Sequence, residues 1–300
     1  MAVSILECVP NVSEGQDRRV VDQLAGAVQR VSGVRLADIH MDADHHRSVF
    51  TFLGSPLGVE TAALALAAQA FALIDMERHR GLHPRMGALD VVPFVPLRGA
   101  TMTEVAALAR RAGEALARAH TVPVYFYGAA ATVPARRLLV DVRRGEYESL
   151  PRKLRDPAWR PDAGPARFDP RAGATAVGAR DVLVAYNVWL DSRDPEAARA
   201  VARAVRESAG GLPAVQAMGV PLTRRGLTQV AMNLLDYRRT SIPRAFDAVR
   251  SEAARLGVAV GRGELVGLAP RAAFEGRSPE SVGLVDFTPE KYLDTHLPGD

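Results

Sequence analysis

The chain has 300 residues, of which 48% are hydrophobic and 24% charged, so it can bury a substantial core in one large or two medium domains and is not expected to be disordered. Its formal charge is +4, but its basic residues are dispersed among acidic ones and only 6% of residues are aromatic, which argues against nucleic-acid binding. No apolar run reaches the roughly 18 residues of a membrane span, and no secretory signal pattern opens the chain, so we expect a cytoplasmic protein without membrane contact.

The first half predicts the order strand, helix, strand, strand, helix, strand, because apolar residues recur there at strand and helix periods in turn. We expect strands at 5–9, 34–40, 47–53 and 89–95, and helices around 20–31 and at 58–74. A helix at 103–120, a strand at 122–127 and short helices within 134–154 extend this unit. Ser13 and Gln16 have capping-box spacing, so we expect Ser13 to cap the first helix rather than to act as a nucleophile.

Residues 155–173 contain four prolines and two glycines, a composition that ends regular structure and indicates a connection. The second half then repeats the same order, with strands at 181–190, 214–220, 227–233 and 258–268 and helices at 194–208 and 242–256. This repeat predicts an α+β protein of two ferredoxin-like (split βαβ) subdomains, 1–178 and 179–300, whose sheets face each other across a ligand cleft.

Five of the seven histidines gather in the segment 40–46 and just after the second predicted helix. Together with Asp42 and Asp44, these imidazoles are suitable ligands for zinc or another transition metal. The spacing of these residues is only weak support for a metal site. Pro84 and a nearby glycine argue against a regular helix that would place the two histidines after the second predicted helix on one face. We therefore expect no metal.

His83 suits acid–base catalysis, because an unperturbed histidine titrates close to neutrality. It lies in an irregular segment between a helix and an apolar strand, with Arg78, Arg80 and Arg85 near enough in sequence to hold an anionic substrate. The alternative is a solvated surface histidine in a basic turn.

The segment 164–173, GPARFDPRAG, is either a linker or a stretch whose unpaired backbone donors and acceptors contact a flat heterocycle. The candidate ligand-binding residues of this segment are Gly164, Pro165, Ala166, Arg167, Phe168, Asp169, Pro170, Arg171, Ala172 and Gly173.

Five segments together resemble the glutamate formiminotransferase family: ECVPNVSEG (7–15), RSVFTFLG (47–54), HPRMGALD (83–90), VPVYFYG (122–128) and GATAVGAR (173–180). The likeness runs from about residue 5 to residue 270. The chain resembles the transferase part of formiminotransferase-cyclodeaminase, without the cyclodeaminase domain.

The resemblance implies two ferredoxin-like subdomains around a tunnel for tetrahydrofolate, with His83 as the catalytic histidine and 164–173 as the folate-contacting segment. It also implies a homodimer and, as a possible partner, a separate cyclodeaminase that acts downstream. The sequence departs from the family at two positions. The resemblance implies an aspartate in relatives at the position of His40 and an asparagine at the position of His46. Asp42 or Asp44 is a candidate to replace that aspartate.

The expected reaction transfers the formimino group from N-formimino-L-glutamate to N5 of tetrahydrofolate, which is the acceptor substrate. We expect Arg47, Arg85 or Arg180 to hold the glutamate carboxylates and the folate tail, and Asp42 or Asp44 to favour the amidinium. Three alternatives stay open: N-formylglutamate as the donor, a folate-binding protein without turnover, and a histidine-rich metallohydrolase.

Overall fold

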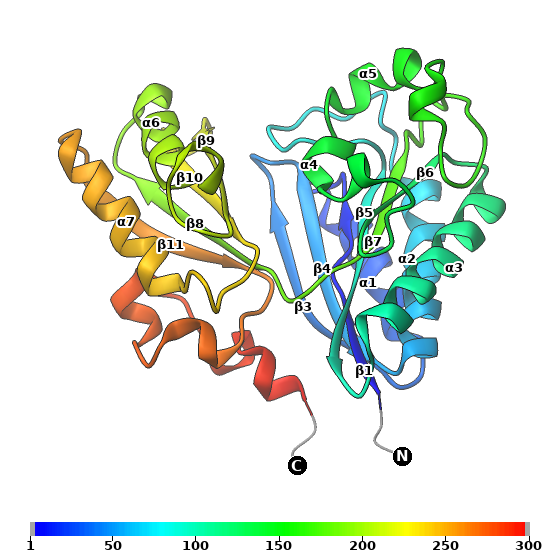
Figure 1. The fold of residues 1–300 in the computed structure, drawn as a ribbon, viewed down its shortest axis with the longest axis horizontal. Coiled ribbons are helices and arrows are strands. Elements are labelled where there is room, and N and C mark those ends of the chain that lie inside the picture. The colour runs from blue at the N-terminus through cyan, green and yellow to red at the C-terminus, as the bar shows by residue number, and fades with distance from the viewer. Residues whose placement is uncertain (1–3, 298–300) are drawn as a thin grey trace. The chain divides into compact units, whose positions relative to one another are not determined.

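The computed structural model describes residues 4–297. These residues form two compact units, one ending at Asp181 and the other beginning at Val182 (Figure 1). Each unit combines helices with a β-sheet of its own, in agreement with the predicted α+β class.

The first unit contains the strands β1 (Ile5–Cys8), β2 (Asn11–Val12), β3 (Val34–Asp42), β4 (Arg47–Gly54), β5 (Leu89–Arg98), β6 (Val124–Gly128) and β7 (Thr175–Ala179). They form one seven-stranded sheet in which β3 pairs with β4 at one edge and β6 pairs with β7 at the other. β1 and β2 share one position, because both pair with β4 and β5. The sheet is antiparallel from β3 to β5, whereas β7 runs parallel to β5 and β6.

The strand predicted at 5–9 is shorter than expected and resumes as β2 beyond Pro10, which has no N–H to donate. The expected cap at Ser13 is wrong. Asp17 caps the first helix by accepting from the backbone N–H of Arg19, while the Ser13 hydroxyl donates to the carbonyl of Gly87 at 2.8 Å.

The helices of the first unit are α1 (Arg18–Gln29), α2 (Pro56–Leu73), α3 (Met102–His120), α4 (Leu139–Val142) and α5 (Glu146–Lys153), with 3₁₀ turns at Pro134–Arg136 and Pro157–Trp159. α1, α2 and α3 cover one face of the sheet, where Leu6 and Cys8 of β1 join the core. α4 and α5 pack on the opposite face over Val91, Tyr125 and Tyr127. Among the described residues of the first unit, no long helix packs over the part of that second face that includes Glu7 of β1.

α2 is long and apolar enough, by length and composition alone, to cross a membrane. Six of its residues are buried and belong to the core of the first unit: Val59, Ala62, Ala63, Leu66, Ala67 and Ala70. α2 therefore packs one of its faces into the core of the first unit.

The second unit contains the strands β8 (Val184–Leu190), β9 (Val215–Leu222), β10 (Leu227–Leu234) and β11 (Val260–Val266), and the helices α6 (Pro195–Val205) and α7 (Ile242–Arg255). Short 3₁₀ turns follow at Glu207–Ala209, Arg271–Phe274, Pro279–Val282, Pro289–Lys291 and Leu293–His296. The sheet is antiparallel throughout, in the order β11-β8-β10-β9. α6 and α7 pack on the face that carries Tyr186, Val188 and Val230.

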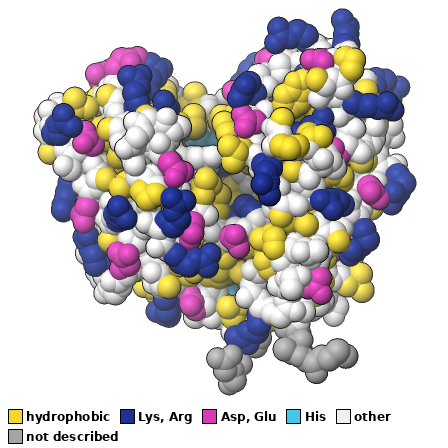
Figure 2. Space-filling model, viewed as in Figure 1, with side chains coloured by type: hydrophobic (Ala, Val, Ile, Leu, Met, Phe, Trp, Pro, Cys, Tyr) yellow, Lys and Arg dark blue, Asp and Glu magenta, His cyan; other side chains and the backbone are white. Residues whose placement is uncertain are grey.

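On the face of the molecule drawn in Figure 2, arginine and lysine side chains are dispersed among acidic, apolar and other groups. The described part of that face shows no continuous basic stripe.

Candidate active site

The segment between α2 and β5, residues 74–88, is irregular, as its glycine and proline content predicts. It packs tightly against the turn between β3 and β4: the N–H of Leu82 donates to the carbonyl of Asp44 at 3.3 Å. A Cβ on Gly81 would lie 2.4 Å from the carbonyl oxygen of His45, so glycine is required for this close approach.

His83 lies in this loop beside Arg47, the first residue of β4. Nη1 of Arg47 is 2.5 Å from Nε2 of His83 and also donates to Oδ1 of Asn11 at 3.0 Å. Because a guanidinium can only donate, Nε2 of His83 accepts, and the neutral ring carries its proton on Nδ1. Nδ1 is buried and has no hydrogen-bond partner among the described residues.

Burial lowers the pKa of His83 well below its ordinary range, and the positive charges of Arg47 and Arg143 lower it further. His83 is consequently neutral near physiological pH and able to accept a proton. The cationic surroundings also suit a substrate that carries carboxylates.

The turn between β3 and β4 holds Asp42 and Asp44, which are both buried. Oδ1 of Asp42 accepts from the backbone N–H of His45 at 2.7 Å and lies 3.1 Å from Nδ1 of the same residue. Burial raises the pKa of Asp42, but the hydrogen bonds from His45 outweigh it and hold that pKa well below its ordinary range. Asp42 thus fixes a turn in which the His45 ring lies 6.1 Å from the His83 ring, centre to centre.

His46 links this turn to the start of the chain through Glu14, a residue that the sequence analysis did not single out. Its Nε2 lies 3.3 Å from Oε1 of Glu14, and its ring stacks on His79 with 4.3 Å between centroids. Burial raises the pKa of Glu14, but hydrogen bonds from His46 and from two backbone N–H groups lower it to about 2. His46 therefore has a structural partner in this chain.

Arg85, a predicted substrate ligand, makes a two-pronged ion pair with Glu148 of α5 at 2.8 and 2.6 Å. Its Nε donates to Nδ1 of His79 at 3.3 Å, so His79 donates from Nε2 to the carbonyl of His46 at 2.8 Å. Burial lowers the pKa of His79 to about 4. In this structure the Arg85 fork holds the loop to α5.

Asp90 anchors the other end of the loop. This residue is 1% exposed, its Oδ1 accepts from the N–H of Met86 at 2.8 Å, and its Oδ2 forms an ion pair with Arg143. Sequence reasoning missed both Asp90 and Arg143, although an acidic residue at the start of a strand that is otherwise apolar was an available signal.

The segment 164–173 begins and ends with glycines of positive φ, 80° at Gly164 and 71° at Gly173. A Cβ on Gly164 would lie 2.1 Å from the carbonyl oxygen of Val122, and one on Gly173 would lie 2.3 Å from that of Met86. The segment is therefore held at both ends against the rest of the first unit.

Within this segment the two halves differ. In the second half, Oδ1 of Asp169 accepts from the N–H of Arg171, and the carbonyl of Asp169 accepts from the N–H of Gly173, both at 2.8 Å. Residues 165–168 make no backbone hydrogen bond with any described residue. The backbone groups predicted to be open to a ligand are thus restricted to the first half.

Arg180 follows β7 directly, and its Nη1 donates to the carbonyl of Asp181 at 2.9 Å. Its charge acts on Glu7 of β1 and Tyr127 of β6, which places the guanidinium near the face opposite α1, α2 and α3.

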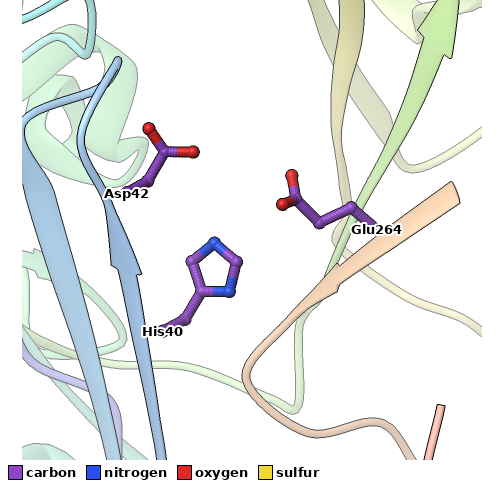
Figure 3. A group of neighbouring side chains, drawn as sticks. All are labelled: His40, Asp42 and Glu264. Atoms are coloured by element: carbon purple, nitrogen blue, oxygen red, sulfur yellow. The ribbon is translucent and has the colours of Figure 1, made fainter. Parts of the chain in front are cut away.

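His40 and Asp42 are two residues apart on β3, so their side chains project to the same side of that strand (Figure 3). Glu264, drawn in the same figure, belongs to β11 of the second unit. Its Oε2 accepts from Nδ2 of Asn187 at 3.1 Å and from Nε2 of Gln229 at 3.0 Å.

Two family descriptions match the chain: the N-terminal subdomain of the formiminotransferase domain over residues 5–180, and the formiminotransferase domain over residues 185–276. The chain is 41% identical over 296 residues to glutamate formimidoyltransferase of Streptococcus pyogenes serotype M1, covering 98% of this chain and 99% of the relative. It is 42% identical over 273 residues to glutamate formimidoyltransferase of Thermoplasma acidophilum, covering 90% of each. It is also 43% identical over 275 residues to formimidoyltransferase-cyclodeaminase of Rattus norvegicus, covering 90% of this chain and 51% of that relative.

Proposed function

Because the chain belongs to the formiminotransferase family, we infer that it is a glutamate formimidoyltransferase, which transfers the formimino group of N-formimino-L-glutamate to tetrahydrofolate. The products are 5-formiminotetrahydrofolate and L-glutamate, as in histidine degradation. The single observation that carries this proposal is the similarity to glutamate formimidoyltransferases along nearly the whole chain.

The proposed catalytic residue is His83. N5 of tetrahydrofolate attacks the carbon of the protonated amidine, and a C–N bond forms to give a tetrahedral intermediate. His83 accepts the proton that N5 loses and delivers it to the glutamate nitrogen, so that the second C–N bond breaks and glutamate leaves as a neutral amine. The lowered pKa of His83 supports this role, because the free base is the form needed first.

The contact with Arg47 determines when His83 can accept the proton. The lone pair of His83 is on Nε2, where Arg47 donates. We propose that a glutamate carboxylate draws the Arg47 guanidinium away, which frees Nε2 to accept the N5 proton. Arg47 then orients the donor, and correct orientation of the two reactants contributes more to the rate than proton transfer alone.

The remaining site residues are proposed with their roles as follows. Arg180 is a second ligand for carboxylates, either of the donor or of the folate tail, whereas the ion pair of Arg85 with Glu148 favours a structural role over substrate binding. Asp42 or Asp44 stabilises the positive charge of the donor's amidinium group. Residues 164–173 contact the folate, chiefly through the open backbone of 165–168.

We further propose that each unit is a ferredoxin-like subdomain, with the boundary near residue 178. The strand order of the second unit and of β1–β5 in the first supports the split βαβ pattern. A cytoplasmic homodimer, which hands its product to a separate cyclodeaminase, completes the proposal.

The test mixes purified protein, tetrahydrofolate and formiminoglutamate and follows the folate adduct by the methenyl absorbance that acid generates. We expect adduct formation, and its absence would refute the transferase proposal. A parallel reaction with N-formylglutamate identifies the donor, since the two donors differ by oxygen for nitrogen at one terminal position. Addition of a metal chelator to the same reaction is expected to leave its rate unchanged. Loss of activity with the chelator would point to the metallohydrolase alternative.

A further inference from the structure

Glu7 is a buried carboxyl group for which the first unit provides no hydrogen bond. It lies on β1 between Leu53 of β4 and Val95 of β5, and only 5% of it is exposed. No hydrogen bond or ion pair joins its carboxyl group to another described residue, and Arg180 acts on it through its charge. A carboxylate that the fold leaves without a donor keeps both oxygens available to a ligand, and ionisable groups with strongly shifted pKa values are concentrated at ligand sites.

The surroundings of Glu7 lead towards the proposed catalytic centre. Arg180 acts electrostatically on both Glu7 and Tyr127, and Arg143 acts on both Tyr127 and His83. The charges of Arg180 and Arg143 are therefore close enough to influence groups from Glu7 to His83.

The distance along this face decides what kind of ligand reaches Glu7. Asn11, which holds Arg47 beside His83, is four residues from Glu7, or about 13 Å at the rise of an extended strand. A formimino group bound at His83 is too small to span this distance. A bicyclic ring with one hydrogen bond at each end bridges roughly 10 Å.

We propose that Glu7 is the ligand of the pterin ring of tetrahydrofolate, with its two carboxylate oxygens accepting hydrogen bonds from N3–H and from the 2-amino group. This inference rests on the proposed function. A pterin presents these two N–H donors side by side, which matches the two oxygens of one carboxylate. Binding at this end places N5, on the far side of the bicyclic ring, towards His83.

The protonation state of Glu7 gives the proposal a distinctive signature. Burial raises the pKa of Glu7 to about 7, and Arg180 only partly opposes this effect. The ligand-binding form is the carboxylate, so the affinity for tetrahydrofolate rises as the pH passes through about 7 and then levels off. Among the neighbours of Glu7, burial raises the pKa of Tyr127 and of Cys8 away from this range, and Leu53 and Val95 are apolar.

The experiment measures the dissociation constant of tetrahydrofolate between pH 6 and 8 for the wild-type chain, for Glu7→Gln and for the control Glu114→Gln, an exposed position on α3. We expect Glu7→Gln to weaken binding roughly 10- to 100-fold above pH 7 and to abolish the pH dependence. The control should match the wild type.

A second ligand, p-aminobenzoylglutamate, has the folate tail but no pterin. Its affinity should be the same in Glu7→Gln as in the wild type, which excludes a general disturbance of the fold. Unchanged affinity for tetrahydrofolate in Glu7→Gln, or an equal loss for both ligands, would overturn the proposal. Failure of the proposed function would instead appear as no folate adduct with the wild-type chain.

Discussion

Nη1 of Arg47 lies 2.5 Å from Nε2 of His83, although the two residues are 36 positions apart in the chain. This contact predicts the pH dependence of turnover. Burial and the Arg47 charge both lower the pKa of His83, so the free base persists to acid pH and activity falls only when the pH drops below the ordinary range of histidine.

Replacing Arg47 with Gln removes the charge and retains a hydrogen-bond donor. We expect the pKa of His83 to rise, so that the acid limb of kcat/KM for formiminoglutamate moves to higher pH at saturating tetrahydrofolate. We also expect KM for the donor to rise roughly 10- to 100-fold, since a charged hydrogen bond to a carboxylate is lost. Arg118→Gln on the exposed side of α3 is the matched control. An acid limb at the same pH in wild type and Arg47→Gln would disprove the coupling.

The Arg85–Glu148 pair predicts an effect on stability rather than on substrate binding. In a double-mutant cycle with Arg85→Met and Glu148→Gln, we expect a coupling energy of about 1 kcal/mol in the free energy of unfolding, because Glu148 is largely exposed and solvent screens the pair. Urea denaturation measures this coupling. A raised KM for formiminoglutamate without any loss of stability would instead support the substrate role that the sequence predicts for Arg85.

Asp90 is expected to be essential for the position of the loop that carries His83. Asp90→Asn weakens the hydrogen bond from Met86 and leaves Arg143 without its carboxylate, so we expect a loss of about 2–4 kcal/mol in the free energy of unfolding. kcat should fall together with the stability, because Asp90 holds the loop that carries His83 in place. Thermal unfolding and steady-state kinetics of the same variant test both effects, and a variant with normal stability and normal kcat would contradict this account.

Glu14 is expected to stabilise the first unit at moderate pH but not in acid. Its pKa is about 2 in the folded state and 4.5 as the ordinary value, so its contribution is present above about 4.5 and is lost as the pH falls towards 2. For this half-buried group we expect on the order of 2 kcal/mol, after allowance for solvent screening. Glu14→Gln should flatten the dependence of the free energy of unfolding on pH within that window. An unchanged slope would show that His46 and Glu14 do not interact in solution.

Most of the secondary structure was predictable because apolar periodicity marks the elements that form each core. The helix predicted at 58–74 spans Pro56–Leu73, and the strand predicted at 227–233 spans Leu227–Leu234. The strand Thr175–Ala179 was missed, since its sequence TAVGA is short, contains two alanines and a glycine, and follows a segment rich in proline and glycine. It forms because β5 and β6 both pair with it, a tertiary effect that a local pattern does not contain.

The candidate site was predictable in its residue types and not in its contacts. Clustered histidines and arginines defined the candidate site, and the irregular segment expected around His83 is present. The pairing of Arg85 with Glu148 and of His46 with Glu14 joins segments far apart in sequence, so neither could be read from local spacing. Glu7 was missed although it gives the same signal as Asp90, a single acidic residue in an otherwise apolar strand.

The role of His83 is tested most directly by single-turnover formation of the folate adduct with His83→Ala, alongside the dissociation constant of tetrahydrofolate for the same variant. If His83 transfers the proton from N5 to the glutamate nitrogen, the rate of adduct formation should fall on the order of 10²- to 10⁴-fold while tetrahydrofolate binds as it does to the wild type. A His83→Ala variant that forms the adduct at the wild-type rate would contradict the proposed mechanism.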